Sequence, residues 1–262
     1  MEKCELLFED THWDDINTNC KVVSSDYAPN NKAFATAGSN GIIVIWSESN
    51  TKICSYDMNV HSVDHTFEIQ AINFLKDSST LIVTYSPEHA FNSQLTSGIF
   101  ALGLDSNFII QGEKFKIKDA HNDVTSAVIR HPINNNFATG GNDKKVYIWD
   151  MPFGRKVGVI GSHGFEYWEG MNPGDQPIES YMNYGLGYIT ALNYVSDSNK
   201  THIISGDSKG NIHIWDVDQR IHLYALLGHT GRINDIECDK NCRIASCAND
   251  SNVIFWKKKN MK

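Results

Sequence analysis

One spacing recurs four times in this chain: a hydroxyl residue lies ten positions before a tryptophan. The pairs are Thr36 and Trp46, Thr139 and Trp149, Ser205 and Trp215, and Ser246 and Trp256. Between them lie Asn-Gly at 40–41 or Asn-Asp at 142–143 and 249–250, followed by apolar runs such as IIVIW. Asn, Asp and Gly tolerate the positive φ of tight turns, and β-branched runs favour buried strands. The spacing therefore predicts the same strand–turn–strand hairpin in four copies.

Histidines precede three of these hairpins, at His12, His121 and His229. Periods of about 40–45 residues with an early histidine and a late Trp-Asp are typical of four-stranded propeller blades. The segments AHNDVTSAVIRHPINNNFATGGNDKKVYIWD and GHTGRINDI resemble the WD-repeat family, and the resemblance covers nearly the whole chain. It implies an all-β fold, the WD-repeat β-propeller.

The resemblance also implies a role for the recurring polar residues. In WD repeats a histidine, a Ser or Thr, the turn Asp and the Trp form a buried hydrogen-bonded tetrad. Two sets are complete: His121, Thr139, Asp143 and Trp149, and His229, Ser246, Asp250 and Trp256. Asn40 replaces the Asp in the first blade, and Lys209 replaces it before Trp215, where we expect no tetrad. A hydrolase triad uses similar residue types, but their recurrence at one spacing favours a structural role.

The interval between Trp46 and Trp149 has room for two blades. The strand patterns EIQAINFL, TLIVTYS, SGIFALGL and FIIQGEKFKI fill it without a closing tryptophan. We therefore predict five blades in a single domain, residues 1–262. Their approximate ranges are 10–58, 66–117, 119–163, 186–228 and 229–262.

The two ends of the chain are complementary. The last blade stops after its third strand at FWKKKNMK, and the chain opens with a short strand pattern, CELLFED. WD-repeat rings often close when one terminus completes the blade of the other, which leaves no exposed sheet edge. We predict that residues 4–9 supply the missing outer strand and close the ring. The alternative is an open ring that a partner chain completes.

Composition excludes several classes of function. The net charge of −8 over 262 residues leaves no broad basic surface, so nucleic acid is not an expected partner. No apolar run has the length of a membrane span, and the N-terminus lacks the apolar stretch of a signal peptide. Cys238, Cys242 and Cys247 lack the second short-spaced pair of a zinc site. Cys238 and Cys247 lie in apolar strand patterns, so we predict that they are small buried hydrophobes. No metal, cofactor or catalytic motif is predicted, and we expect the cytosol or the nucleus.

Three connections are longer than a propeller needs: 11–20, 86–97 and 162–187. Because strands alternate in direction, all three should emerge on one face. The longest holds the candidate partner-binding residues Phe165, Glu166, Tyr167, Trp168, Glu169, Tyr181 and Tyr184. Aromatic side chains are enriched in interface hot spots, and acidic ones favour a basic partner. The structural alternative is a local cap in which these aromatics fold back over an outer strand.

We therefore predict a non-enzymatic adaptor or scaffold that binds other proteins or peptides as a subunit of a larger complex. The alternatives are a reader of basic, histone-like tails and a propeller enzyme. A narrower resemblance lies in KAFATAGSNGIIVIW and IQAINFLKDSSTLIVTYS, followed by GIFALGL. These segments are similar to the last two blades of the mitotic-checkpoint and mRNA-export WD-repeat proteins. Those proteins bind a short acidic-centred helical motif in their partners.

Overall fold

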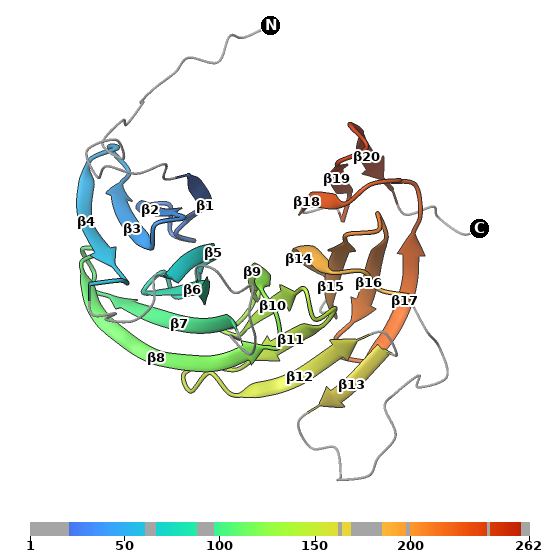
Figure 1. The fold of residues 1–262 in the computed structure, drawn as a ribbon, viewed down its shortest axis with the longest axis horizontal. Coiled ribbons are helices and arrows are strands. Elements are labelled where there is room, and N and C mark those ends of the chain that lie inside the picture. Colours follow the sequence, from blue (N-terminus) through green and yellow to red (C-terminus); the bar gives the residue numbers. More distant parts are fainter. Residues whose placement is uncertain are drawn as a thin grey trace, which may run out of the picture.

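The computed structural model describes residues 21–60, 67–87, 97–161, 185–197, 200–239 and 242–257, and the backbone of 164–168. All regular elements in these ranges are strands, and they form five antiparallel sheets. Figure 1 shows the sheets following one another along an arc in chain order, from blue to red. The predicted five-bladed, all-β propeller is confirmed.

The first two sheets are four-stranded. The first contains β1 (Val22–Tyr27), β2 (Ala33–Gly38), β3 (Ile42–Ser47) and β4 (Lys52–Asp57). The second contains β5 (Phe67–Phe74), β6 (Thr80–Pro87), β7 (Ser97–Leu104) and β8 (Ile110–His121). This is the blade without a closing tryptophan. Its last strand extends past the predicted blade end at 117, because His121 still pairs with Ser97.

The remaining sheets differ in strand number. The third has five strands: β9 (Thr125–Arg130), β10 (Phe137–Gly141), β11 (Val146–Trp149), β12 (Lys156–Gly161) and β13 (Gly164–Trp168). The fourth has β14 (Ile189–Asp197), β15 (Lys200–Asp207), β16 (Ile212–Asp216) and β17 (Ile221–Leu226). The fifth has β18 (Ile233–Cys238), β19 (Ile244–Ala248) and β20 (Val253–Trp256).

The four repeated hairpins share one turn geometry. The residue directly after each predicted turn position has positive φ: Gly41 (84°), Lys144 (63°), Gly210 (88°) and Ser251 (65°). Asx turns explain why the residue with positive φ follows the turn position. Asp143 Oδ1 accepts the Lys145 N–H at 3.2 Å, and Asp250 Oδ1 accepts the Asn252 N–H at 3.0 Å. In two hairpins positive φ therefore falls one residue beyond the Asn-Asp pair.

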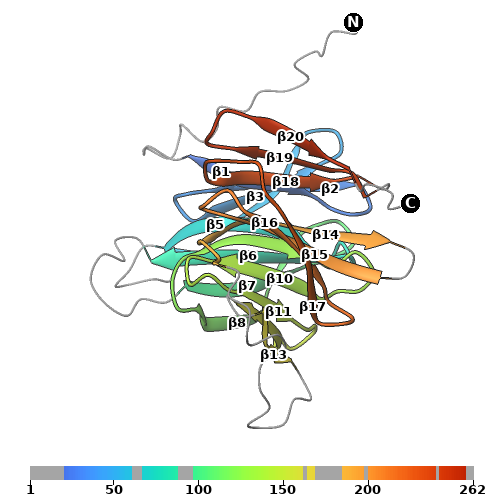
Figure 2. The same ribbon diagram turned by 90° about the vertical axis from the view of Figure 1, so that its right-hand side faces the viewer.

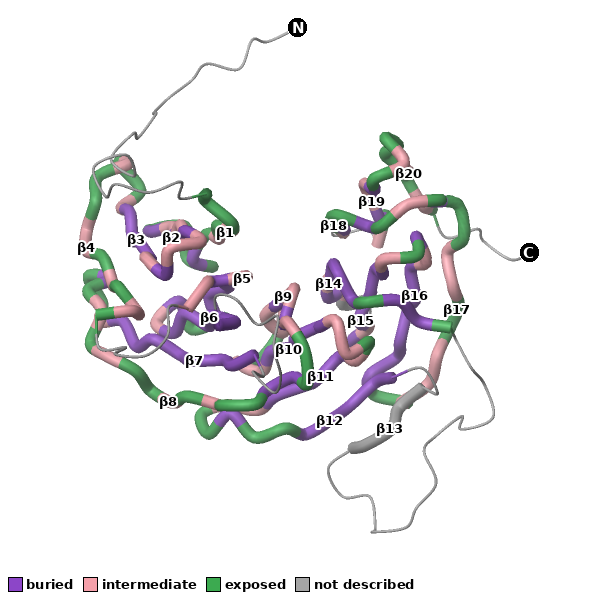
Figure 3. The backbone as a smooth tube through the Cα atoms, viewed as in Figure 1, coloured by how far each residue is buried: buried purple, intermediate pink, exposed green. Residues whose placement is uncertain are grey.

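The hydrophobic core is divided among the four seams between successive sheets. One cluster joins the first and second sheets, another the second and third, and two more follow at the next seams. The inner strand of each sheet packs against the inner strand of the next, from β1 through β5, β9 and β14 to β18. Figure 3 shows that burial is concentrated in the second and third strands of the middle sheets. Each sheet is therefore stabilised mainly by its neighbours in the chain.

The two ends of the arc differ from its middle. In the side view of Figure 2, the first sheet (blue) and the last sheet (red) lie at the same end of the molecule. Strands β11 and β16 are buried along their whole length, whereas β20 alternates between exposed and half-buried residues. Within the described part of the chain the last sheet has three strands. The predicted closing strand, residues 4–9, lies outside the described residues, as do residues 11–20 and His12.

Strand β13 corrects the prediction for the longest insertion. Residues 164–168 pair antiparallel with β12, so they belong to the third sheet and not to a free loop beyond residue 163. The sequence GFEYW is rich in residues that favour strands. The outer edge of β12 also has backbone N–H and C=O groups that a returning chain can pair.

Candidate functional site

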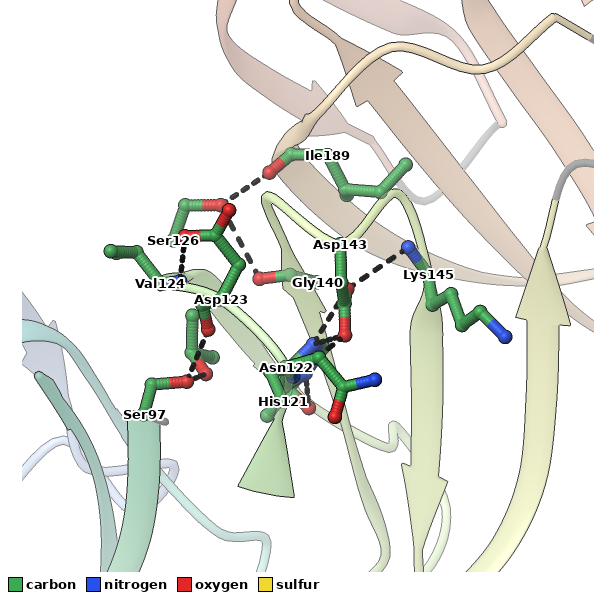
Figure 4. Close-up of polar contacts among 12 residues, drawn as sticks. Ser97, His121, Asn122, Asp123, Val124, Ser126, Gly140, Asp143, Lys145 and Ile189 are labelled. Atoms are coloured by element: carbon green, nitrogen blue, oxygen red, sulfur yellow. Dashed lines mark hydrogen bonds and ion pairs between the residues drawn. The ribbon is translucent and has the colours of Figure 1, made fainter. Parts of the chain in front are cut away.

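Three side chains of the third sheet and one from the last strand of the second form a continuous hydrogen-bonded set at one end of the third sheet. His121, at the end of β8, lies 3.0 Å from Asp143 Oδ1 through Nδ1 and 2.8 Å from Thr139 Oγ1 through Nε2. Trp149 Nε1 donates to the same Thr139 oxygen at 2.8 Å. Figure 4 shows His121 beneath Asp143, whose carboxylate also contacts Lys145 in the turn. The structure therefore brings together all four residues of this predicted tetrad.

The protonation of this set follows from its surroundings. Burial lowers the pKa of His121, although the hydrogen bond to Asp143 opposes the effect. Burial raises the pKa of Asp143, but the bonds from His121 and from the Asn122 and Lys145 N–H groups outweigh it, and the pKa falls. A neutral His121 with its proton on Nδ1 donates to the carboxylate and accepts the Thr139 hydroxyl proton on Nε2. One tautomer thus satisfies every donor in the set.

The connectivity of this set is that of a Ser-His-Asp triad, but its burial argues against catalysis. His121 and Thr139 are both completely buried. The Thr139 oxygen also accepts the Trp149 N–H, which occupies a lone pair that a nucleophile would need. The tetrad instead ties the β8–β9 connection to the β10–β11 turn, and so holds one end of the third sheet rigid. We call the side of the ring that carries these connections the tetrad face.

The last sheet repeats the arrangement. His229 Nδ1 lies 2.8 Å from Asp250 Oδ2, and His229 Nε2 lies 2.8 Å from Ser246 Oγ. Trp256 Nε1 donates to the same serine oxygen at 2.8 Å. The hydrogen bond from the Thr230 N–H, followed by that from His229, lowers the pKa of Asp250 to about 2. The carboxylate is therefore ionised at neutral pH.

The first sheet contains only part of the tetrad among its described residues. Trp46 Nε1 donates to Thr36 Oγ1 at 2.9 Å, and Asn40 Oδ1 accepts the Ile42 N–H at 3.2 Å. The Asn40 side-chain amide nitrogen is buried without a hydrogen-bond partner among the described residues. Asparagine thus reproduces the turn function of Asp and leaves an unsatisfied donor.

In the fourth sheet another carboxylate takes over the role of the missing Asp. Trp215 Nε1 donates to Ser205 at 2.9 Å, while the Lys209 ammonium reaches the Gly185 carbonyl at 2.9 Å. Asp207, which is completely buried, accepts the N–H groups of Gly187 at 2.7 Å and of Lys209 and Asn211 at 2.9 Å. Sequence reasoning missed Asp207. The available signal was an Asp two residues after the aligned Ser205, in SGDSKG.

The candidate partner-binding residues fall into two groups. The backbones of Phe165, Glu166, Tyr167 and Trp168 lie on β13, and their side chains are outside the described structure. Glu169, Tyr181 and Tyr184 lie outside the described residues. Strand β13 is the last strand of the third sheet in the order β13-β12-β11-β10-β9, and it lies at the outer side of the arc (Figure 1).

The direction of β13 determines on which side of the ring residues 164–168 lie. Gly164 pairs with Gly161 near the tetrad face, whereas Trp168 pairs with Gly158, farther along β12. The prediction that 162–187 stands wholly on the tetrad face is therefore wrong for 164–168. The chain is back at that face by Gly187, whose N–H binds Asp207. The antiparallel pairing is the reason, because a strand added to β12 must run back along it.

A groove of about 540 Å³ lies beside β20, between the fourth and fifth sheets. Leu223, Tyr224 and Leu226 of β17 line one side. Cys238, Cys242, Ile244 and Trp256 of the last sheet line the other. In the third sheet the fourth strand fills the corresponding seam, where Val159 of β12 packs against Trp149. The groove thus marks the place of a fourth strand in the last sheet.

Other chemistry is sparse in the part of the chain that the structure describes. There, no group of His, Cys, Asp and Glu side chains could hold a metal ion, and no helix is long and apolar enough to span a membrane. Cys238, Cys242 and Cys247 are half-buried, and Cys238 and Cys247 are free thiols. Burial, reinforced by Cys242, raises the pKa of Cys238 to about 11, so this thiol is protonated at neutral pH.

Comparisons with known proteins agree with this architecture. The family model "WD domain, G-beta repeat" matches residues 112–150 and 220–257. The chain is 23% identical to the 77 kDa echinoderm microtubule-associated protein of Strongylocentrotus purpuratus, over 90% of this chain and 41% of that protein. It is 22% identical to Nuclear distribution protein PAC1 of Arthroderma otae, over 53% of this chain and 36% of that protein. The chain thus spans less than half the length of these curated relatives.

Both matched repeats contain one of the complete tetrads, His121 to Trp149 and His229 to Trp256. Each repeat also includes the outer strand of one sheet, β8 or β17, and three strands of the next. The mitotic-checkpoint and mRNA-export resemblance stays a prediction. With its recurring hairpins, its buried tetrads and its five successive sheets, this chain is an all-β, five-bladed propeller, and two of its segments are similar to WD repeats.

Proposed function

We propose that this protein is a non-enzymatic interaction scaffold that holds other proteins or peptides as a subunit of a larger assembly. Propellers built from WD repeats are generally protein-interaction scaffolds, and the described sheets provide a rigid frame of the kind that positions binding segments. We also propose the cytosol or the nucleus as its location. The free thiols of Cys54, Cys238 and Cys247 support a reducing compartment.

The observation that carries this proposal is the extra strand β13 at the edge of the third sheet. An edge strand offers backbone N–H and C=O groups that can pair with a strand from another chain. The sequence of β13, GFEYW, adds three aromatic residues to that edge. Tyr and Trp bind with large contact areas at low cost in conformational entropy. We therefore propose β13 and the rest of 162–187 as the partner-binding segment.

Trp168→Ala tests this surface. We expect the variant to bind captured partners more weakly by about 2 kcal/mol or more, because aromatic anchors dominate interface energies. Its melting temperature should match that of the parent. The matched control is Phe153→Ala, because Phe153 is 71% exposed in the β11–β12 turn of the same sheet. Partner capture from cell extract, followed by titration of the purified partner, measures the difference.

The opposite pattern would contradict the proposal. If Trp168→Ala lowers the melting temperature while binding is unchanged, β13 and its neighbours form a structural cap. A stable variant with full binding would remove this segment as the contact surface and leave another surface of the scaffold to be mapped.

The alternative partner is a basic, histone-like tail. Glu166 and Glu169, together with the net charge of −8, favour a Lys- or Arg-rich segment. A synthetic Lys- and Arg-rich peptide should then bind with an affinity that falls as salt rises. Glu166→Gln combined with Glu169→Gln should weaken it. Salt-independent binding, or no loss in the double variant, would exclude this class of partner at the segment.

A further inference from the structure

Each inner strand contacts the next through a polar side chain. At the first seam, Ser24 Oγ accepts the Ile72 N–H at 3.1 Å and Asp26 Oδ2 accepts the Phe74 N–H at 2.7 Å. At the second, Asn73 Oδ1 accepts the Arg130 N–H at 2.8 Å. These bonds join the backbones of successive sheets at the centre of the arc.

At the remaining seams the polar side chain donates to a backbone carbonyl instead of accepting a backbone N–H. The Ser126 hydroxyl donates to the Ile189 carbonyl across the third seam (Figure 4). At the fourth seam the Thr190 hydroxyl donates to the Ile233 carbonyl at 2.5 Å. Ser126 and Thr190 occupy the bulge of their inner strands, where the register with the second strand shifts. A polar residue at or near this bulge thus recurs at the seams.

The last inner strand repeats this pattern at the open end of the arc. Asn234 lies at the bulge of β18, the position of Ser126 and Thr190. Asp235 follows it, at the position that Ser24 occupies after the bulge of β1. Both side chains are exposed. Strand β18 therefore exposes polar side chains at the positions where other inner strands contact the next sheet.

The third strand of the last sheet carries the matching apolar surface. In the first, third and fourth sheets the residues one and three positions before the Trp are Ile45 and Ile43, Ile148 and Val146, and Ile214 and Ile212. All six are at most 3% exposed. They belong to the clusters shared with the following sheet. The corresponding residues of β20, Phe255 and Val253, are 81% and 61% exposed.

The first sheet has a complementary apolar surface at the other end. Tyr27, at the end of β1, is 61% exposed. Its counterparts in the inner strands of the second and fourth sheets are Phe74 and Tyr194, which are buried in the clusters shared with the preceding sheet. Both ends of the arc thus expose the surfaces that a neighbouring sheet covers at the four seams.

We propose that the opening between β1 and β18 takes a further antiparallel β-blade, donated by another polypeptide. Its faces would be apolar, one against Val253 and Phe255 and the other against Tyr27, and its inner strand would bond Asn234 and Asp235. The proposal rests on the scaffold function and names the kind of partner. We expect a β-sheet in this opening because two sheets pack against each other at each of the four described seams. The two end surfaces differ in sequence, so contacts between copies of this chain would be heterologous, one end against the other, with no further blade between them.

Site-specific crosslinking in the native cell tests this proposal. The photoreactive residue benzoylphenylalanine is placed in the full chain at position 255, at position 27 and, as a control, at position 153. We expect positions 255 and 27 to crosslink to one segment of a single partner, and position 153 not to reach it. With that segment as the purified probe, Phe255→Asp should weaken binding at least tenfold. Phe153→Asp should bind like the parent, and both variants should keep its melting temperature.

Three outcomes would overturn the proposal. Crosslinks from both positions to this chain's own residues 1–20, and to no other protein, would show that the chain covers its own ends. Crosslinks to another copy of the chain would show self-assembly. Crosslinks to unrelated proteins, or none at all, would show that no blade occupies the opening. If the Trp168→Ala variant nevertheless loses its partner, the scaffold function stands and the donated blade alone is wrong.

Discussion

At the scale of single residues, buried carboxylates hold the turns of the hairpins. Asp143 accepts the Nδ1–H of His121 and two backbone N–H groups, and Asp207 accepts three backbone N–H groups in the fourth sheet. A buried donor left without a partner costs about 1–3 kcal/mol. Removal of either carboxylate therefore leaves at least three donors without their acceptor, although only Asp143 belongs to a tetrad.

Replacing these carboxylates tests their contribution to stability. We expect Asp143→Ala and Asp207→Ala each to lower the free energy of unfolding by about 1–3 kcal/mol, because donors are left unpaired. Lys209→Ala should change it by less than about 0.5 kcal/mol, because its ammonium makes an exposed bond. Urea denaturation measures all three. Equal losses for Lys209→Ala and Asp207→Ala would contradict the assignment.

The lowered pKa of His213 makes the free energy of unfolding depend on pH. Burial, reinforced by the neighbouring His222, lowers the pKa of His213 from 6.5 to about 4. The unfolded chain therefore takes up the proton first as the pH falls. The stabilising contribution is complete above pH 6.5 and is lost as the pH falls to about 4, a loss of about 3 kcal/mol. His213→Gln should flatten this part of the curve. Parallel curves for parent and variant, measured by denaturation from pH 7 to 4, would contradict the prediction.

At the scale of elements, the outer edge of the last sheet is the least complete part of the fold. The groove beside β20 has the position of a fourth strand and is lined by apolar side chains from β17 and the last sheet. Lys200, Lys257 and the buried Asp216 also line it, and Lys200 lies 4.0 Å from Asp216. The N-terminal sequence CELLFED has an apolar centre. Its match to the apolar lining supports the prediction that residues 4–9 occupy the groove.

Deleting residues 1–9 tests this strand. We expect a lower melting temperature and increased aggregation, because an unpaired edge is exposed. Cys242, which lines the groove, should then react faster with a thiol reagent. The matched control replaces residues 1–9 with a Gly- and Ser-rich segment of the same length. A truncated chain that melts like the parent, with unchanged Cys242 labelling, would show that another segment completes the sheet.

At the scale of the whole molecule, stability is a sum over neighbouring sheets. Each inner sheet shares two seams, whereas the first and the last share one among the described residues. In such quasi-one-dimensional arrays the terminal units open more readily than the middle ones. The arc should therefore open from its ends.

Hydrogen exchange measures this gradient. We expect the slowest amide exchange in the buried strands β6, β7 and β10, and faster exchange in β1, β19 and β20. The comparison of β10 with β19 is matched, because both are five-residue second strands of sheets with a complete tetrad. Equal protection of these two strands would show that the ends of the arc are covered.

The repeat was predictable from sequence because its determinants are local. The distance from Thr139 to Trp149 is set within one hairpin, and the resulting bond of 2.8 Å follows from strand register alone. The second blade was also predictable without a tryptophan, because its strand patterns are bounded by turn residues. Five sheets and their order therefore follow from the amino-acid sequence by itself, whereas the tetrad members follow from its resemblance to WD repeats.

Only the tertiary structure decided the features that depend on distant parts of the chain. Asp207 is recognisable because the Gly187 N–H arrives beside it from twenty residues away. The sequence GFEYW favours a strand, but only the structure shows that this strand pairs with the outer edge of β12. Phe255 has the same apolar pattern as Ile45 in the sequence, yet one is exposed and the other is buried. Hydrophobic patterning specifies which side chains could be covered, whereas the presence of a neighbouring sheet determines which of them are.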